Sequence, residues 1–237
     1  MILQSKKAPV SEIFFSYQGE GIYAGLPQIF VRFVGCNLQC NYCDTAYAKK
    51  INIKTKYYTQ EEVYKTILEI YKKNKKSFFG QMPSVSFTGG EPLIYADFLL
   101  DLLKQLKKDK FNIYLETNGS LPEQLNKIHK YCDIVSMDIK LKSACKKDLL
   151  KSHKQFLKIV KDKVFVKIVV SKDTKRHEFI NAIDLISNIS KNIKLVVQPD
   201  TNGKNFVIDI FEFYNAATKK IKDVRILPQM HKIWKVR

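Results

Sequence analysis

The sequence lacks any long apolar segment. No run approaches the roughly 18 apolar residues that a helix needs to cross a bilayer, and the first residues, MILQSKKAPVSEIFF, lack the apolar stretch of a secretory signal. We therefore expect a soluble, cytoplasmic protein. Linker-like and low-complexity segments are also missing, and 237 residues are an ordinary length for one α/β domain. We expect a single domain over residues 1–237, with its barrel at about 28–220 and a tail at 221–237.

Arginine is scarce although the chain is strongly basic. The 41 Lys and Arg residues include only four Arg, and with 23 Asp and Glu the formal net charge is +18. A charge of this sign suggests a polyanionic partner such as nucleic acid. Nucleic-acid readers, however, depend on Arg for bidentate contacts, and the lysines are scattered along the whole chain. We interpret the charge as a solvated lysine surface and expect neither nucleic acid nor a membrane as a partner.

Short β-rich runs alternate with amphipathic helical stretches six times. This repetition predicts parallel strands joined by right-handed crossovers. Eight such units would close a TIM barrel, so six favour an α/β fold with an open, partial (β/α)6 barrel, extended by a short N-terminal strand and a C-terminal tail. The expected strands are Gln28–Val34, Ser84–Thr88, Asn112–Glu116, Ile134–Asp138, Val164–Val170 and Lys194–Gln198. The first expected helix begins at Thr59, and the second contains Phe98–Leu106. Four further helices are expected near 121–130, 145–160, 175–189 and 206–218.

Unusual polar sequences follow each expected strand. Three cysteines come after the first strand, TGGEP after the second and ETNG after the third. DIK lies at the fourth, and VSKD and QPD follow the fifth and the sixth. Because the carboxyl ends of parallel strands meet at one edge of the sheet, we expect a single site there.

Five cysteines are present, and three of them, Cys36, Cys40 and Cys43, stand in a C-x3-C-x2-C arrangement. The odd number and the clustering argue against a disulfide framework. Three thiolates on one loop can hold a [4Fe–4S] cluster and leave its fourth iron open to a substrate. A zinc knot is the alternative, but structural zinc takes four ligands and no fourth Cys or His lies nearby. We favour the cluster and assign no function to Cys132 or Cys145.

The cysteine triplet, together with GGEP at 89–92, resembles the radical S-adenosylmethionine (SAM) superfamily. The resemblance implies that the methionyl amino and carboxylate groups bind the open iron. It also implies that an electron from the reduced cluster breaks the C–S bond, and that the resulting 5′-deoxyadenosyl radical takes a hydrogen from the substrate. The glycines fit this function because a backbone without Cβ can approach the methionyl group closely.

Two further segments are more specific. EIFFSYQGEG at 12–21 and RILPQMHK at 225–232 make the chain resemble the 7-carboxy-7-deazaguanine synthase family from end to end. The resemblance implies ring contraction of 6-carboxy-5,6,7,8-tetrahydropterin to 7-carboxy-7-deazaguanine with release of ammonia, in the preQ0/queuosine (7-deazapurine) pathway. It further implies Mg²⁺ and a homodimer, and we expect a reducing partner such as flavodoxin or ferredoxin.

The resemblance also assigns residues, and it makes no protein side chain a catalytic group because the cluster and SAM carry the chemistry. The cluster ligands would be Cys36, Cys40 and Cys43, and the protein ligand of Mg²⁺ would be Thr45. The expected SAM contacts are Tyr42, Cys43, Asp44, Gly90, Ser136, Asp138, Ile139 and Lys140. The expected pterin contacts are Tyr17, Gln18, Gly19, Glu20, Arg32, Thr88, Gln229, His231 and Arg237, with Arg32 pairing bidentately with the pterin carboxylate.

The residue patterns leave alternatives open at several of these positions. Thr45 fits a helix N-cap as well as a magnesium ligand, and the segment 17–20 also fits a plain glycine-containing turn. Arg32 could form a surface ion pair instead. Glu116 either lines the pocket or is a buried structural acid.

The fourth strand departs from the family pattern. Ser136-Met137-Asp138-Ile139-Lys140 stands where Ser-Pro-Lys is common, and aligning the lysines leaves Ser136 and Asp138 as alternatives for the SAM ribose. At the other end of the site, Arg237 lies six residues beyond His231. We hypothesise that its α-carboxylate reaches the donor edge of the pterin ring.

Two rival functions fit parts of the sequence. A glycyl-radical activating enzyme also carries C-x3-C-x2-C, but a protein substrate needs no polar clamp of the QGEG and LPQMH kind. A non-catalytic, metal-stabilised RNA-binding module would account for the basic charge, and it predicts zinc rather than iron and salt-dependent affinity for nucleic acid. We favour the ring-contracting enzyme over both.

Overall fold

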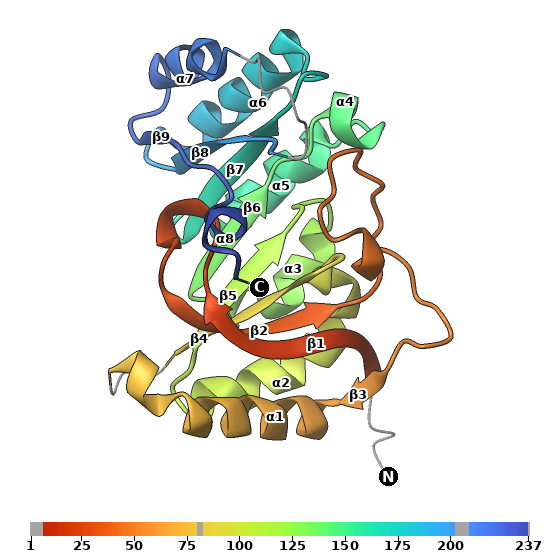
Figure 1. Ribbon diagram of the computed structural model, residues 1–237. Helices are drawn as coiled ribbons and strands as arrows, with labels where there is room; N and C mark the ends of the chain where they lie inside the picture. Colours follow the sequence, from red (N-terminus) through yellow and green to blue (C-terminus); the bar gives the residue numbers. More distant parts are fainter. Residues whose placement is uncertain (1–6, 80–82, 202–208, 237) are drawn as a thin grey trace.

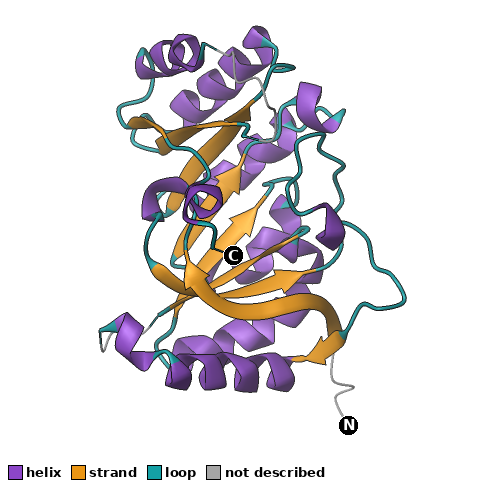
Figure 2. Cartoon of the chain, in the orientation of Figure 1, coloured by secondary structure: helices purple, strands orange, loops and turns teal. Residues whose placement is uncertain are grey.

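The computed structural model describes residues 7–79, 83–201 and 209–236. Within these residues, nine strands form one open sheet in the order β3-β1-β2-β4-β5-β6-β7-β8-β9. Figures 1 and 2 show the longer helices along the outer side of this curved sheet, with the C-terminal end of the chain on the opposite side. The strands are β1 Lys7–Tyr17, β2 Pro27–Phe33, β3 Tyr57–Thr59, β4 Ser84–Gly89, β5 Asn112–Thr117, β6 Ile134–Asp138, β7 Val164–Val170, β8 Lys194–Pro199 and β9 Val224–Ile226.

The six strands expected from the sequence are β2 and β4 to β8, and all of them pair in parallel. The predicted partial barrel is therefore confirmed, since the sheet does not close. Three additions differ from the expectation, and one of them is β3, a short strand that pairs antiparallel with β1. β1 is eleven residues long and pairs antiparallel with β2, and the segment predicted as a tail contributes β9, which pairs in parallel with β8.

The helices follow the predicted alternation with one correction. A single helix over 145–160 is wrong, because Lys146 adopts a left-handed conformation at φ 62° and separates α4 from α5. Asp148 then accepts a hydrogen bond from the backbone N–H of Leu150, at the start of α5. The expected positions 206–208 lie outside the described residues. The helices are α1 Gln60–Lys73, α2 Ala96–Lys108, α3 Pro122–Ile128, α4 Lys142–Cys145, α5 Leu150–Val160, α6 Arg176–Ile189, α7 Ile210–Thr218 and α8 Met230–Trp234.

Strand alternation decides which side chains face the helices and which face inward. In β2, Ile29, Val31 and Phe33 belong to the main apolar core, whereas Phe30 and Arg32 line the opposite, inner face. Successive side chains of a strand point to opposite faces, and the other parallel strands repeat the pattern. The outward residues are Val85, Phe87, Ile113, Leu115, Val135, Met137, Val166, Ile168, Leu195 and Val197. The inner face is therefore the place where polar side chains can gather.

The N-terminus of α1 carries the capping box expected at Thr59. Its Oγ1 accepts from the backbone N–H of Glu62 at 3.2 Å, and Oε2 of Glu62 accepts from the backbone N–H of Thr59 at 2.6 Å. These bonds pair two N–H groups that the helix itself leaves unsatisfied.

Replacing the cap tests this assignment. Thr59→Ala is expected to lower the free energy of unfolding by about 1 kcal/mol, because the N-cap oxygen is lost. Chemical denaturation followed by circular dichroism measures it. The matched control is Thr66→Ala in the same helix, where alanine is the better helix former and no loss is expected. Equal destabilisation by both substitutions would contradict the capping role.

Candidate active site

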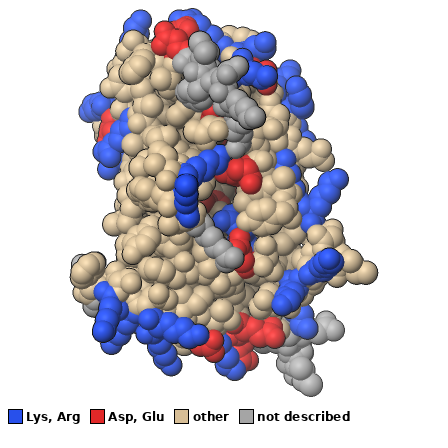
Figure 3. Space-filling view, viewed as in Figure 1, with Lys and Arg blue, Asp and Glu red and all other residues tan. Residues whose placement is uncertain are grey.

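A cavity of about 680 Å³ opens at the carboxyl ends of the parallel strands. This volume lies within the range of small-molecule sites. The space-filling view shows a hollow near the middle of the face with both acidic and basic side chains beside it (Figure 3). The cavity is lined from six strands by Arg32, Thr88, Glu116, Asp138, Lys167 and Gln198.

The cysteine loop leaves the end of β2 and is fastened at several points. The backbone N–H groups of Gly35 and Cys36 donate to the carbonyls of Ala48 and Lys49 at 2.8 and 3.1 Å. The ammonium groups of Lys49 and Lys147 donate to the carbonyls of Cys40 and Asn37 at 2.9 and 3.0 Å. The loop is thus held by backbone and lysine contacts that do not use the thiols.

All three thiols of this loop line the cavity and are partly exposed. Tetrahedral zinc with Zn–S distances near 2.3 Å would bring its sulfurs within about 3.8 Å of one another. In the described part of the chain, the only group of three or more His, Cys, Asp or Glu with ligand atoms mutually within 4.8 Å is Glu20, Asp44 and His231. The three cysteine sulfurs therefore do not all lie within 4.8 Å of one another, so their arrangement here is not that of a tetrahedral zinc site.

The thiols lie in a poorly solvated environment. Burial raises the pKa of Cys36, and it raises that of Cys40 to about 11. The backbone N–H of Leu38 donates to Sγ of Cys36 at 3.4 Å, and the Asn118 amide lies 4.0 Å from the same sulfur. These donors can stabilise sulfur that has lost its proton, which metal binding requires.

The GGEP turn lies directly against the cysteine loop. A Cβ on Gly90 would lie 2.0 Å from the carbonyl oxygen of Gly35, so no other residue fits there. The backbone N–H groups of Gly90 and Glu91 donate to Phe33 and Gly35 at 3.1 and 2.8 Å. Glycine is needed here because two backbones approach closely.

Glu91 is fully buried behind this turn. Oε1 accepts from the Leu93 N–H at 3.1 Å and from the Thr117 hydroxyl at 2.8 Å, and Oε2 accepts from the Asn118 N–H at 2.8 Å. Burial raises the pKa of Glu91 to about 7 although these donors favour the charged form. Because Asn118 donates in turn to the Asn37 side chain at 3.0 Å, Glu91 connects the turn to the cysteine loop.

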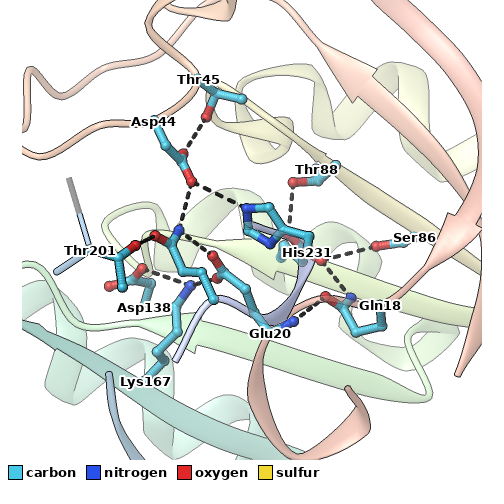
Figure 4. A network of polar contacts seen from close by, with 12 residues as sticks. Gln18, Glu20, Asp44, Thr45, Ser86, Thr88, Asp138, Lys167, Thr201 and His231 are labelled. Carbon is cyan, nitrogen blue, oxygen red and sulfur yellow. Dashed lines mark hydrogen bonds and ion pairs between the residues drawn. The ribbon is translucent and has the colours of Figure 1, made fainter. Parts of the chain in front are cut away.

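Two carboxylates and two ammonium groups meet on the inner face, and Figure 4 shows Glu20, Asp138 and Lys167 of this group. Asp138 accepts from Lys140 at 2.8 Å and from Lys167 at 3.2 Å, and Lys167 also pairs with Glu20. Burial opposes ionisation of Glu20, but Lys167, Gln229 and His231 outweigh it and lower the pKa of Glu20 to about 2. Burial likewise opposes the charge of Lys140, yet the nearby Asp138 raises its pKa. Glu20, Lys140 and Lys167 are therefore charged at neutral pH.

Two acceptors on the cavity wall have no hydrogen-bond partner among the residues that the structure describes. They are Oδ1 of Asp138 and Oε1 of Gln198, and both atoms are buried. An unpaired buried acceptor is costly, so such atoms indicate a ligand that donates to them. A nucleoside with ribose hydroxyls and an exocyclic amino group supplies donors of this kind.

A second polar group lies toward β1. The Gln18 amide donates to Oε1 of Gln28 at 3.0 Å and to Oε1 of Glu116 at 2.8 Å. The Thr88 hydroxyl donates to Oε2 of Glu116 at 2.8 Å. Glu116 thus lines the cavity and also holds its neighbours in place. It combines the two roles that the sequence left open, a pocket-lining residue and a structural acid.

The C-terminal segment covers this group. Gln229 donates to Glu20 and to Asp44 at 2.7 Å each, and the Met230 N–H donates to the Gly19 carbonyl at 2.8 Å. A Cβ on Gly19 would lie 2.5 Å from Cβ of His231, so glycine allows this segment to pack closely. The segments 17–20 and 229–231 therefore form one wall of the cavity.

Comparisons with known proteins agree with this geometry. The Radical SAM superfamily model matches residues 30–196. Two curated 7-carboxy-7-deazaguanine synthases, from Geobacter sulfurreducens and Archaeoglobus fulgidus, are each 34% identical and cover 95% and 98% of this chain and 96% and 100% of their own lengths. The chain belongs to the 7-carboxy-7-deazaguanine synthase family.

A solved structure agrees at the level of the fold. QueE from Escherichia coli superimposes with a TM-score of 0.65 at 21% identity, covering 95% of each chain. As a radical SAM enzyme of the synthase family, the protein uses a [4Fe–4S] cluster held by three cysteines, with SAM, a small-molecule substrate and a reductant. The residues present fit both groups, because three thiols and two orphaned buried acceptors face one cavity.

Nearly all the site residues expected for this synthase line the cavity. Thr45 lies there, as do Tyr42, Cys43, Asp44, Gly90, Ser136, Asp138 and Lys140 of the SAM set. Ile139 does not, since its side chain is buried in the apolar core. Of the pterin set, Tyr17, Gln18, Gly19, Glu20, Arg32, Thr88, Gln229 and His231 line the cavity. Arg237 lies outside the described residues.

Three functional candidates of the synthase were not assigned from the sequence. Lys167 and Gln198 line the cavity, and Glu91 supports the cysteine loop. Lys167 interrupts an apolar strand, VFVKIVV. Because successive side chains of a strand point to opposite faces, the strand places the Lys167 side chain on the inner face. That signal was available in the sequence.

No helix among the described residues is long and apolar enough to cross a membrane.

The support of the loop by Glu91 can be tested directly. Glu91→Gln is expected to lower the free energy of unfolding by about 1–3 kcal/mol, because both carboxylate oxygens accept hydrogen bonds and the new NH2 group would face a donor. Chemical denaturation measures the loss, and Glu69→Gln on the exposed side of α1 is the control. An unchanged unfolding midpoint for Glu91→Gln would show that the buried carboxylate does not hold the turn.

Proposed function

We propose that the protein converts 6-carboxy-5,6,7,8-tetrahydropterin to 7-carboxy-7-deazaguanine with release of ammonia, in the queuosine (7-deazapurine) pathway. One observation supports this most strongly: a single cavity unites the cysteine loop, two orphaned acceptors and the polar wall from both ends of the chain. When bound, the reduced cluster and SAM supply the radical that removes a hydrogen from the pterin. The protein residues bind both molecules, orient them and exclude water.

The SAM half of the cavity is formed by the cysteine loop, the GGEP turn and the ends of β6 and β8. Cys36, Cys40 and Cys43 hold the cluster. Between the two candidates for the ribose we choose Asp138, because its Oδ1 is buried without a partner whereas the Ser136 side chain bonds to Tyr114. We add Gln198 as an acceptor for SAM on the same ground.

The pterin half is formed by the β1–β2 turn, Arg32 and the C-terminal segment. The amino-pyrimidinone edge of a pterin is rich in donors, and the ionised Glu20 can accept from it. Arg32 pairs with Glu12 through Nε at 2.8 Å, so its terminal nitrogens can take the pterin carboxylate. Gln18 is held by Gln28 and Glu116 and fixes the turn that carries Glu20.

Thr45 is the protein ligand that we propose for Mg²⁺. It precedes the short 3-10 helix Ala46–Ala48, but its side chain makes no capping hydrogen bond there. Instead, its hydroxyl donates to Oδ1 of Asp44 at 3.1 Å and lies on the cavity wall. A hydroxyl and a nearby carboxylate suit an ion that keeps part of its water shell.

Several broader assignments rest on the family resemblance. We propose that the chain is one domain over residues 1–237, acts in the cytoplasm as a homodimer, and receives electrons from flavodoxin or ferredoxin.

The cluster assignment predicts a sharp difference among the cysteines. Alanine at Cys36, Cys40 or Cys43 should abolish iron retention and the formation of 5′-deoxyadenosine, because three thiolates are needed to hold the cluster. Cys132→Ala, at a buried thiol remote from the cavity, should retain both. Anaerobic reconstitution, iron analysis and product mass spectrometry measure this. Iron retained by all three loop variants would refute the assignment.

The product decides the reaction itself. The reconstituted enzyme with dithionite, SAM, Mg²⁺ and the carboxypterin should release ammonia and 7-carboxy-7-deazaguanine. Cleavage of SAM without that product would point to another radical SAM substrate. Zinc in place of iron would favour the RNA-binding alternative.

Arg32 provides a test of substrate binding. Arg32→Lys should raise KM for the carboxypterin by about tenfold or more, since an ammonium cannot replace a bidentate guanidinium. The SAM affinity should stay unchanged. Arg176→Lys, at an exposed ion pair with Glu212, is the control. Steady-state kinetics measure both, and an unaltered KM would leave Arg32 as a structural partner of Glu12.

A further inference from the structure

Lys167 is a buried cation in the middle of an apolar strand. Its neighbours in β7 are Val164–Val166 and Ile168–Val170, and its side chain is only 11% exposed. A lysine is rarely buried unless it is paired. Here it is paired twice, with Glu20 and, at 3.2 Å, with Asp138.

The two partners of Lys167 belong to different halves of the cavity. Glu20 follows β1 and is held on its other oxygen by Gln229 of the C-terminal segment. Asp138 ends β6 and shares Oδ2 between Lys140 and Lys167, while its Oδ1 has no hydrogen-bond partner within the described part of the chain. Lys167 thus joins Glu20 of the pterin wall to Asp138 of the SAM wall by ion pairs (Figure 4), while Gln229 makes a second connection between Glu20 and Asp44.

The charges balance only with Lys167 present. Glu20 and Asp138 carry two negative charges, and Lys140 and Lys167 carry two positive ones. Without Lys167, Glu20 would keep Gln229 and the more distant His231, and Asp138 would keep Lys140 alone. A buried carboxylate that loses its ion-pair partner turns away, takes up a proton or admits water.

We infer that Lys167 is a positioning residue that fixes the Glu20 carboxylate for the pterin and the Asp138 carboxylate for SAM. The inference rests on the proposed function for the identity of the two ligands. Lys167 acts through these carboxylates and needs no contact of its own with either molecule.

The test uses two paired comparisons in the reconstituted, unreduced enzyme, where no turnover occurs. Dissociation constants for SAM and for the carboxypterin are measured by anaerobic equilibrium dialysis. The first pair is Glu20→Gln against the double variant Glu20→Gln/Lys167→Met. The second pair is Asp138→Asn against Asp138→Asn/Lys167→Met. The double variant with Glu20→Gln removes a whole ion pair and leaves Asp138 with Lys140, which a buried site tolerates better than a single unpaired charge. In the second pair, Lys140 has lost Asp138 in both members, so the comparison still isolates the loss of Lys167.

Loss of Lys167 is expected to weaken a different ligand in each of the two backgrounds. In the Glu20→Gln background, loss of Lys167 should leave the carboxypterin Kd within about threefold but weaken SAM by about tenfold or more. In the Asp138→Asn background, the same loss should spare SAM and weaken the carboxypterin to a similar degree. Non-additivity of this kind marks residues that act through one another, and truncating one partner of a buried charge pair is costly.

The control is Lys163→Met, which lies just before β7 and donates to the backbone carbonyls of His129 and Cys132. It should lower the melting temperature without changing either Kd. If Lys167→Met weakened the same ligand equally in both backgrounds, Lys167 would contact that ligand directly and the inference would fail. Unchanged affinities throughout would overturn it as well. If the unmutated enzyme binds SAM but no carboxypterin, the proposed function fails, while the Asp138 pair still tests Lys167.

Discussion

The balance of buried charge on the inner face of the sheet is the constraint on which the site depends. Glu20, Lys167 and the pair Asp138 and Lys140 come from three different segments, and ion pairs join them into one network. The cost of burying these groups is offset by ion pairs that also fix the directions of the carboxylates. Glu20 also accepts a hydrogen bond from Gln229, so the network connects an N-terminal segment with a C-terminal one. The ion pairs that balance the buried charges therefore also hold the carboxylates in the positions in which they can bind ligands.

A second constraint is close packing between backbones at the carboxyl edge of the sheet. Gly90 touches the carbonyl of Gly35, and Glu91 fixes Asn118 beside the cysteine loop. The loop therefore has its conformation set by β2, β4 and β5 through contacts that do not involve sulfur. A loop supported in this way can present three thiols to a cluster without being folded by the metal.

The sequence predicts much of this molecule because its strands alternate cleanly. Val85 and Phe87 face the helices while Ser86 and Thr88 face inward, so the strand positions, the open barrel and the cavity edge follow from local pattern. Nearly all the residues that the cysteine spacing and the family resemblance point to line the cavity, although the cavity has further lining residues, such as Lys167 and Gln198, that neither indicates. Pairings between distant segments are different. Nothing in the local pattern shows that Lys167 meets Glu20, that Gln229 reaches Asp44, or that Lys146 breaks a helix.

The most direct measurement is the electron paramagnetic resonance spectrum of the reduced, reconstituted protein before and after addition of SAM. The account requires a cubane cluster whose fourth iron is open to the methionyl group, so SAM must alter the signal of the reduced cluster. Replacement of a cysteine in the loop must remove that signal. A cluster spectrum indifferent to SAM, or a protein that holds zinc and shows no cluster signal, would contradict the account.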